Sequence, residues 1–281
     1  MGIEKKRETG HKILLFLIMA LCVGGCNMQN RFLYFPSAAR PSSQVLEREG
    51  MKLWQETAGD YQGLVAAVEA PAPNGTIVLF HGNGGTVLDR TFYVRPFTEL
   101  GFRVILAEYP KYGGRPGQVG ETPFVADGLE TVRLACKQYG NPLYVLGESL
   151  GCGVAAAVVK GTDLPVAGIM LITPWDTLAS VARSLFPFLP VQLVLTDTYD
   201  NAVNLRSFQK NIAVIGAEHD EILPIRHAIN LYNALPEGRK RMWIIKGAGH
   251  NDWPLYADAA LFKEITDFVM IDKSWQVRRK A

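Results

Sequence analysis

The stretch Leu143-Tyr-Val-Leu-Gly-Glu-Ser-Leu-Gly-Cys-Gly153 decides the fold. Its first four residues are apolar and partly β-branched, which is typical of a strand covered on both faces. Gly147, Ser149 and Gly151 then form a Gly-x-Ser-x-Gly turn, and the run Val154-Ala-Ala-Ala-Val-Val159 predicts a buried helix. In such a strand–turn–helix the serine lies on a strained turn with its hydroxyl exposed at the end of the sheet. Ser149 is therefore the candidate nucleophile, and the alternative is a serine that only caps the helix.

Length and composition describe an ordinary globular chain. The 281 residues can bury one large core or two small ones, and 48% hydrophobic with 20% charged residues is unexceptional. The formal charge of +2 depends on the first 25 residues, because without their four basic and two acidic residues the chain has 25 of each kind. This balance argues against a nucleic-acid-binding surface, so no nucleic-acid partner is expected.

Residues 1–26 resemble the signal of a bacterial lipoprotein. Basic residues precede the apolar run Ile13–Val23, which at eleven residues is too short to span about 30 Å of hydrocarbon but suits a signal peptide. Val23-Gly-Gly-Cys26 resembles a lipobox, which implies that Cys26 receives lipid and becomes the new N-terminus. Asn27, the residue after the lipidated cysteine, then favours sorting of the anchored protein to the periplasmic face of the outer membrane. The alternative is an uncleaved anchor helix that extends through Gly25.

Residues 27–49 are expected to form a tether that leads into one domain over residues 50–281. The aromatic-rich segment Arg31–Ser37 is expected to pack on that domain as an N-terminal clasp. Buried strands are predicted at 63–68, 76–80, 103–107, 143–146, 167–172, 212–216 and 241–245, and helices at about 87–100, 123–139, 154–159, 225–235 and 256–271. Strands that alternate with helices predict a mostly parallel sheet covered on both faces.

The stretch from Pro174 to Phe208 breaks this alternation, because it is too long for an ordinary connection. It contains Leu185-Phe-Pro-Phe-Leu-Pro-Val191 and Leu193-Val-Leu195, a dense apolar patch with prolines. We expect a small apolar cap over about residues 175–208, at the catalytic end of the sheet. Such a cap suits an acyl or aromatic substrate group, and the alternative is a helical hairpin that does not contact substrate.

A serine nucleophile needs a base within hydrogen-bond reach and an acid that orients the base. His250 follows the last predicted strand, where a loop at the carboxyl edge of the sheet can bring its ring over Ser149. His250 is therefore the candidate base. The other histidines lie in the signal (His11), in a glycine-rich loop (His81), beside the candidate acid (His219) and on the expected solvent face of a helix (His227).

Asp220 is the candidate acid, because it follows the preceding strand and gives the chain order Ser149, Asp220, His250. Its carboxylate would hold one tautomer of the His250 ring and stabilise the imidazolium. Four other carboxylates remain alternatives by position. They are Asp176 after an earlier strand, Glu218 and Glu221 beside Asp220, and Asp252 two residues from His250.

An acyl-transfer serine also needs N–H donors for the tetrahedral oxyanion. The backbone N–H of Leu150, directly after the serine, is the first candidate donor. The loop His81-Gly-Asn-Gly-Gly85 follows a strand, and the N–H of Asn83 is the second candidate. The loop lacks the G-x-G-x-x-G and GK[ST] patterns of nucleotide sites. No cofactor is expected, and no spacing of His, Cys, Asp and Glu resembles a metal site.

These motifs together resemble the α/β-hydrolase-fold serine hydrolases. The similarity covers about Phe32 to Phe268 and is carried by Leu33-Tyr-Phe-Pro36, His81-Gly-Asn-Gly-Gly85, Gly147-Glu-Ser-Leu-Gly151, Gly216-Ala-Glu-His-Asp220 with Pro224, and Gly247-Ala-Gly-His-Asn-Asp252. The nearest look-alikes are the protein-depalmitoylating α/β-hydrolase-domain proteins and bacterial serine-aminopeptidase-like relatives. Two departures, Glu108 in place of aspartate and Gly85 in place of asparagine, are expected near the mouth of the site, where they bear on specificity.

The resemblance implies an α/β-hydrolase fold, a mostly parallel twisted sheet with helices on both faces and a small apolar cap. It implies a serine hydrolase that cleaves carboxylic esters or thioesters of an apolar acyl substrate through Ser149, His250 and Asp220. A serine aminopeptidase, with Glu108 or Asp176 in an acidic pocket, is the enzymatic alternative. A lipid-anchored binding protein on a catalytically retired fold is the non-enzymatic one. The sequence leaves the oligomeric state open.

Overall fold

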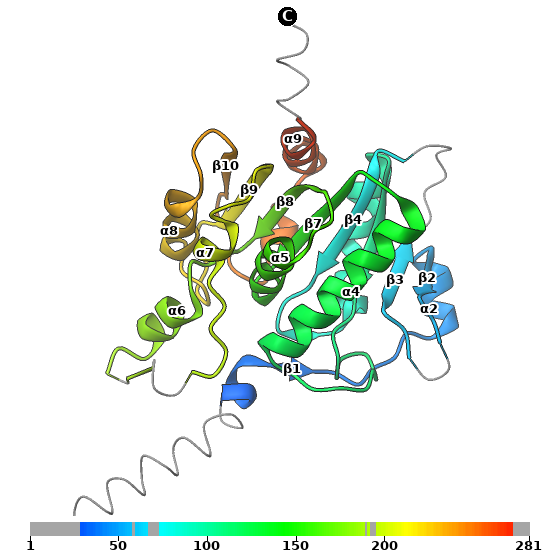
Figure 1. Ribbon diagram of the computed structural model, residues 1–281, viewed down its shortest axis with the longest axis horizontal. Helices are drawn as coiled ribbons and strands as arrows, with labels where there is room; N and C mark the ends of the chain where they lie inside the picture. Colours follow the sequence, from blue (N-terminus) through cyan, green and yellow to red (C-terminus); the bar gives the residue numbers. More distant parts are fainter. Residues whose placement is uncertain (1–28, 58–59, 67–72, 189, 192–194, 272–281) are drawn as a thin grey trace, which may run out of the picture.

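The computed structural model describes residues 29–57, 60–66, 73–188, 190–191 and 195–271 (Figure 1). The expected signal peptide with Cys26 lies outside these residues. Within the described part of the chain, no helix is both long and apolar enough to cross a membrane.

An eight-stranded sheet runs through the molecule, as the alternating pattern predicts. Its strand order is β10-β9-β8-β7-β4-β6-β3-β2, with parallel neighbours except where β3 pairs with β6 and with β2. The strands are β2 (Met51–Trp54), β3 (Gly63–Ala66), β4 (Gly75–Phe80), β6 (Phe102–Ala107), β7 (Leu143–Glu148), β8 (Val166–Ile172), β9 (Asn211–Ala217) and β10 (Lys240–Ile245). The strand of the Gly-x-Ser-x-Gly stretch, β7, lies inside the sheet between β4 and β8, and every one of its residues is buried.

Helices cover both faces of the sheet (Figure 1). One face carries α4 (Glu121–Tyr139), α5 (Leu150–Gly161), α7 (Asn201–Leu205) and α8 (Arg226–Ala234), and the other carries α3 (Val94–Glu99) and α9 (Ala259–Met270). The short helices α2 (Ser43–Arg48) and α6 (Leu178–Leu185) lie at the periphery. Two layers of helices around a mostly parallel sheet confirm the predicted fold class.

The single helix expected over Val87–Leu100 is divided in two. A 3-10 helix, η1 (Val87–Tyr93), comes first and begins with a capping box between Thr86 and Asp89. The α-helix α3 then starts at Val94, which places Pro96 in its first turn. Proline has no N–H to donate, and the N–H groups of the first helical turn have no acceptor within the helix, so proline is tolerated there.

The expected tether is folded onto the domain from residue 29 onward. Residues 29–33 are helical, and Phe35–Pro36 (β1) pairs in parallel with Gly84–Gly85 (β5). Tyr34 is buried, with its ring 5.1 Å from that of Phe124, and its hydroxyl donates to Asp197 Oδ2 at 2.5 Å. The aromatic segment therefore packs on the domain, as the sequence predicts, and reaches the loop that follows β4.

The close approach of α5 to β4 gives a stability prediction for Gly151→Ala. A β-carbon at residue 151 would lie 2.0 Å from the carbonyl oxygen of Phe80 and 2.7 Å from that of His81. Because backbone atoms cannot move aside without separating α5 from β4, we expect the free energy of unfolding to fall by at least about 1–3 kcal/mol in urea denaturation.

Gly161→Ala, in the same helix, is the matched control. Its new β-carbon would meet only Leu129 methyl groups, at 3.5 Å. This variant should be unchanged or more stable by about 0.5–1 kcal/mol, since alanine favours a helix over glycine. Equal unfolding curves for the two variants would contradict the close approach of α5 and β4.

Candidate active site

Ser149 stands on the turn between β7 and α5, with a strained backbone at φ 52° and ψ −117°. Few residues other than glycine adopt a positive φ, so the surrounding structure must hold this conformation. The Ser149 N–H donates to Ile172 O at 2.9 Å, and Trp175 Nε1 donates to Ser149 O at 3.1 Å. A β-carbon at Gly147 would lie 2.5 Å from Gly151 O, which explains the glycine on the strand side of the turn.

Three side chains predicted to act together form one chain of hydrogen bonds. His250 Nε2 lies 3.0 Å from Ser149 Oγ, and His250 Nδ1 lies 2.7 Å from Asp220 Oδ2. Because the carboxylate accepts, Nδ1 carries the proton and Nε2 is left to accept from the serine hydroxyl. All three residues are buried, with exposed fractions of 9, 8 and 7% for Ser149, His250 and Asp220.

Backbone donors hold Asp220 in place. Its second oxygen, Oδ1, accepts from the N–H of Ile222 at 3.0 Å and from that of Leu223 at 2.6 Å. These two bonds satisfy the oxygen that faces away from His250, so the carboxylate keeps one orientation after burial.

The four alternative carboxylates have other partners. Glu218 binds Lys246, which lowers the pKa of Glu218, and Asp252 accepts from the N–H of Gly249. Glu221 accepts from the backbone N–H of His250 rather than from its ring, and backbone hydrogen bonds lower the pKa of Glu221. Asp176 Oδ1 contacts His227 Nδ1 at 2.9 Å. None of the four contacts the His250 ring within the described residues.

The expectation that His227 faces solvent is wrong. The side chain is 2% exposed and lies between Asp176 and α6, with Nε2 3.1 Å from Ser184 Oγ. Burial acts to raise the pKa of Asp176, but hydrogen bonds from His227 and from the Thr177 N–H hold it below its usual value. Asp176 and His227 thus join the end of β8 to α6 and α8.

The loop after β4 is supported from beneath by a buried pair. His81 Nε2 lies 2.9 Å from Glu108 Oε1, and neither side chain is exposed. His81 Nδ1 lies 2.7 Å from the carbonyl oxygen of Gly82. Because the N–H and C=O of a trans peptide point in opposite directions, this contact turns the N–H of Asn83 away from the His81 ring.

Two more donors fix the next peptide of the same loop. Asn83 O accepts from the Phe35 N–H at 2.9 Å and from the Tyr112 hydroxyl at 2.6 Å. The N-terminal clasp therefore helps to set the conformation of the candidate oxyanion loop. The expectation that Glu108 lies near the mouth of the site is wrong, because its side chain is fully buried beside His81. Gly85 pairs with Pro36 of the clasp and does not line the cavity described next.

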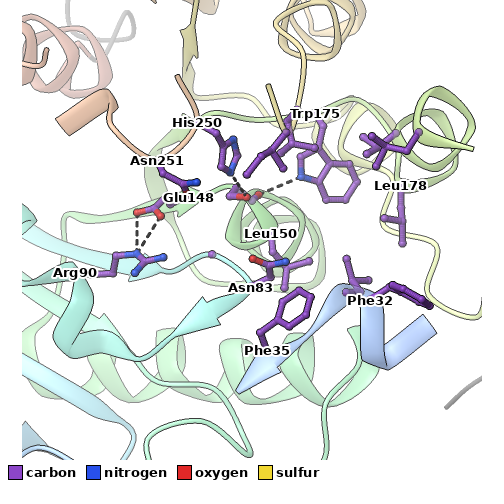
Figure 2. Close-up of a pocket in the computed structure, with 17 residues that line it drawn as sticks. Phe32, Phe35, Asn83, Arg90, Glu148, Leu150, Trp175, Leu178, His250 and Asn251 are labelled. Atoms are coloured by element: carbon purple, nitrogen blue, oxygen red, sulfur yellow. Dashed lines mark hydrogen bonds and ion pairs between the residues drawn. The ribbon is translucent and has the colours of Figure 1, made fainter. Parts of the chain in front are cut away.

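A cavity of about 450 Å³ opens above Ser149 (Figure 2). The candidate oxyanion donors Asn83 and Leu150 both line it. Most of its remaining wall is apolar and comes from three parts of the chain. They are the clasp, the segment from the end of β8 through α6, and the loop after Asp220. The apolar lining residues are Phe32, Leu33, Phe35, Trp175, Leu178, Val181, Leu185, Ile222 and Leu223. The expected cap segment therefore contributes to the cavity wall through α6.

Sequence reasoning missed two charged residues of this cavity. Arg90 comes from η1, and Glu148 is the unspecified second position of the Gly-x-Ser-x-Gly turn. Arg90 Nε donates to both carboxylate oxygens of Glu148, at 3.0 and 3.2 Å (Figure 2). The two residues are 58 positions apart, so no local spacing signals the contact.

Known proteins resemble the chain in sequence. A family model described as alpha/beta hydrolase fold matches residues 75–202. The uncharacterized protein Rv2307c of Mycobacterium tuberculosis is 30% identical over 267 residues, which cover 90% of this chain and 92% of that protein. Lysophosphatidylserine lipase ABHD12 of Gallus gallus is 26% identical over 207 residues, which cover 66% of this chain and 54% of that protein.

Solved structures resemble the chain in fold. The esterase Pf2001 of Pyrococcus furiosus superposes with a TM-score of 0.64 at 14% identity and covers 84% of this chain and 97% of its own. At that identity the likeness concerns the fold alone. The chain belongs to the α/β-hydrolase fold family and is a hydrolase of that superfamily.

Proposed function

We propose that the protein is a serine hydrolase that cleaves carboxylic ester or thioester bonds of apolar acyl substrates. The observation that carries the proposal is the hydrogen-bond chain from Ser149 through His250 to Asp220, at the floor of a cavity. Ser149 Oγ attacks the substrate carbonyl while His250 Nε2 takes its proton. His250 then gives that proton to the leaving group, and Asp220 stabilises the imidazolium between the two transfers.

Deacylation uses the same groups in reverse. His250 Nε2 takes a proton from a water molecule, whose oxygen attacks the acyl carbonyl on Ser149 and releases the acid. In both halves the negative oxygen of the tetrahedral intermediate would accept from the backbone N–H groups of Asn83 and Leu150. Loss of one such donor costs roughly 10²–10³ in rate, so the supports of the loop matter for catalysis.

The wall of the cavity favours an apolar acyl group. Trp175, Leu178 and Val181 line it from the segment after β8, and Phe32 and Phe35 line it from the clasp. Burial of each methylene of an acyl chain contributes about 0.8 kcal/mol, so a wall of this kind selects acyl chains by length. Among the proteins similar in sequence, one is named a lysophosphatidylserine lipase, which supports an acyl-ester substrate.

The aminopeptidase alternative is less favoured. It needs a carboxylate free to bind the amino terminus of a peptide, and neither Glu108 nor Asp176 lines the cavity. Glu148 does line it, but accepts from Arg90 and from the Tyr93 hydroxyl at 2.9 Å. A carboxylate already paired in this way offers little to a second cation.

The N-terminal segment bears on where in the cell the protein would encounter an acyl substrate. We propose that lipid on Cys26 holds the chain at a bacterial membrane. Phe32 follows six residues later, a distance of at most about 20 Å of extended chain, and lines the cavity while 73% exposed. An anchor at Cys26 would therefore keep the open side of the cavity close to the lipid surface.

Ester hydrolysis by the Ser149→Ala variant tests the function. With p-nitrophenyl esters from acetate to long acyl chains, we expect the full-length protein in neutral detergent to show an optimum chain length. Ser149→Ala should lower kcat by at least about a thousandfold, because the nucleophile is lost. Release of p-nitrophenol, followed by its absorbance, gives the rates.

Ser184→Ala is the matched control. Ser184 also contacts a buried histidine, His227, at 3.1 Å, but it does not line the cavity. Its kcat should stay within about threefold of the original, since Ser184 lies outside the hydrogen-bond chain of Ser149, His250 and Asp220. Equal activity of Ser149→Ala and Ser184→Ala on every ester would rule out the proposed nucleophile.

Glu108→Gln tests the support of the oxyanion loop. Glu108 Oε1 lies 2.9 Å from His81 Nε2 and Oε2 accepts from the Val87 N–H at 3.1 Å, so an amide would turn one acceptor into a donor. We expect kcat to fall about tenfold with a smaller change in KM, because the affected N–H acts on the transition state. Glu99→Gln, an exposed carboxylate on α3, is the control. A rise in KM with unchanged kcat would argue against this role.

A further inference from the structure

One end of the cavity carries charged residues that the proposed acyl-transfer steps do not use. Of the 17 residues that line the cavity, Arg90 and Glu148 are the two with a formal charge, counting histidine as neutral. In Figure 2 they lie on one side of His250, whereas Phe32, Phe35 and Leu178 lie on the other. The cavity thus has a polar end and an apolar end, with the candidate nucleophile between them.

The guanidinium of Arg90 is hydrogen-bonded through its Nε alone, within the described residues. Its Nε donates to both oxygens of Glu148, and the Tyr93 hydroxyl donates to Glu148 Oε2. The Arg90 side chain is 16% exposed and that of Glu148 11%. The group is therefore fixed in position before any ligand arrives.

The terminal nitrogens of Arg90 have no protein acceptor in the described part of the chain. Both of its hydrogen bonds start from Nε, although a guanidinium carries five N–H donors. Because the Arg90 side chain lines the cavity and is 16% exposed, water or a ligand in the cavity can accept from these nitrogens. The free edge of the guanidinium has the planar geometry that matches two oxygens of a carboxylate or phosphate.

This free edge lies close to the nucleophile. A β-carbon built on Gly82 would be 3.3 Å from Arg90 Nη2 and 3.5 Å from Ser149 Cβ. The arginine and the serine thus flank the same glycine of the oxyanion loop. A substrate with its carbonyl at Ser149 Oγ would bring atoms a few bonds beyond that carbonyl to the guanidinium.

The two ends of the cavity assign the two halves of the substrate. An acyl chain gains most from the apolar end, so the alcohol half points toward Arg90. We propose that Arg90 binds an anionic group, a phosphate or a carboxylate, on the alcohol half of the substrate. This assignment rests on the proposed serine hydrolase function and narrows its substrates to acyl esters with a negatively charged leaving alcohol.

Glu148 has a distinct part in this site. Its carboxylate neutralises Arg90 in the empty cavity and aims the free edge of the guanidinium, while the Tyr93 hydroxyl holds the carboxylate. The anion then binds a formally neutral pair. Removal of the Glu148 charge should therefore strengthen anion binding, and removal of the Arg90 charge should weaken it.

Three octanoyl esters that differ in the alcohol measure the preference. They are 1-octanoylglycerol, 1-octanoylglycerol 3-phosphate and the octanoyl ester of glyceric acid, assayed with full-length protein in neutral detergent. The readout is the ratio of kcat/KM for each anionic ester to that for the neutral ester. We expect a ratio above one. The anionic ester with the higher ratio shows whether the site prefers a phosphate or a carboxylate.

Arg90→Gln should lower that ratio by roughly tenfold or more, mainly through KM, because a charge-assisted hydrogen bond is lost. Arg95→Gln is the matched control, since Arg95 also pairs with a glutamate, Glu99, but lies on the surface with 86% of its side chain exposed. Glu148→Gln should change the ratio in the opposite direction, and this variant carries the test if Arg90→Gln does not fold.

The outcomes separate the two proposals. Hydrolysis of the neutral ester with a ratio that neither Arg90→Gln nor Glu148→Gln changes would overturn the anion site alone. A wild-type ratio at or below one would do the same. Absence of Ser149-dependent hydrolysis of all three esters would overturn the serine hydrolase proposal, and the anion site with it.

Discussion

The turn between β7 and α5 is the constraint on which the rest of the structure depends. It holds Ser149 at a positive φ, a conformation that costs an ordinary residue about 1–3 kcal/mol. The surroundings impose it, because Gly147 and Gly151 let α5 approach β7 and β4 more closely than any side chain would allow. The strain leaves the hydroxyl at the carboxyl edge of the sheet, where the loops after β4, β9 and β10 meet.

Each of those loops is fixed by hydrogen bonds from behind. Backbone N–H groups hold Asp220 from the loop after β9, and Asp220 in turn orients the ring of His250 from the loop after β10. The pair His81 and Glu108 holds the loop after β4. The candidate catalytic groups therefore meet in a preorganised arrangement, as transition-state stabilisation requires.

The sequence predicted the parts of the site that local motifs encode. Ser149, Asp220 and His250 each directly follow a strand or a short loop after one, and parallel strands bring their carboxyl ends to one edge. For this reason their contact could be expected without coordinates. The strand pattern likewise gave the parallel sheet, although it missed the edge strand β2 (Met51–Trp54), which pairs in antiparallel fashion with β3.

Contacts between side chains distant in sequence were beyond such reasoning. His227 looks like a surface residue of α8 until its partner Asp176, 51 positions earlier, is placed against it. Glu148 and Arg90 each look like a surface charge, and only the packing of η1 over the serine turn brings them into the cavity. The spacing of residues along the chain indicates whether a segment is a helix or a strand. It does not indicate which charged side chains of two such segments will be in contact.

The activated state of Ser149 is tested by locating the residue that a fluorophosphonate modifies. These reagents phosphonylate a serine only when a base and oxyanion donors activate it. We expect a single adduct on the peptide that contains Ser149, found by mass spectrometry, and its loss in His250→Ala. An adduct on another residue, or none on protein whose unfolding curve shows that it is folded, would rule out Ser149 as the activated nucleophile.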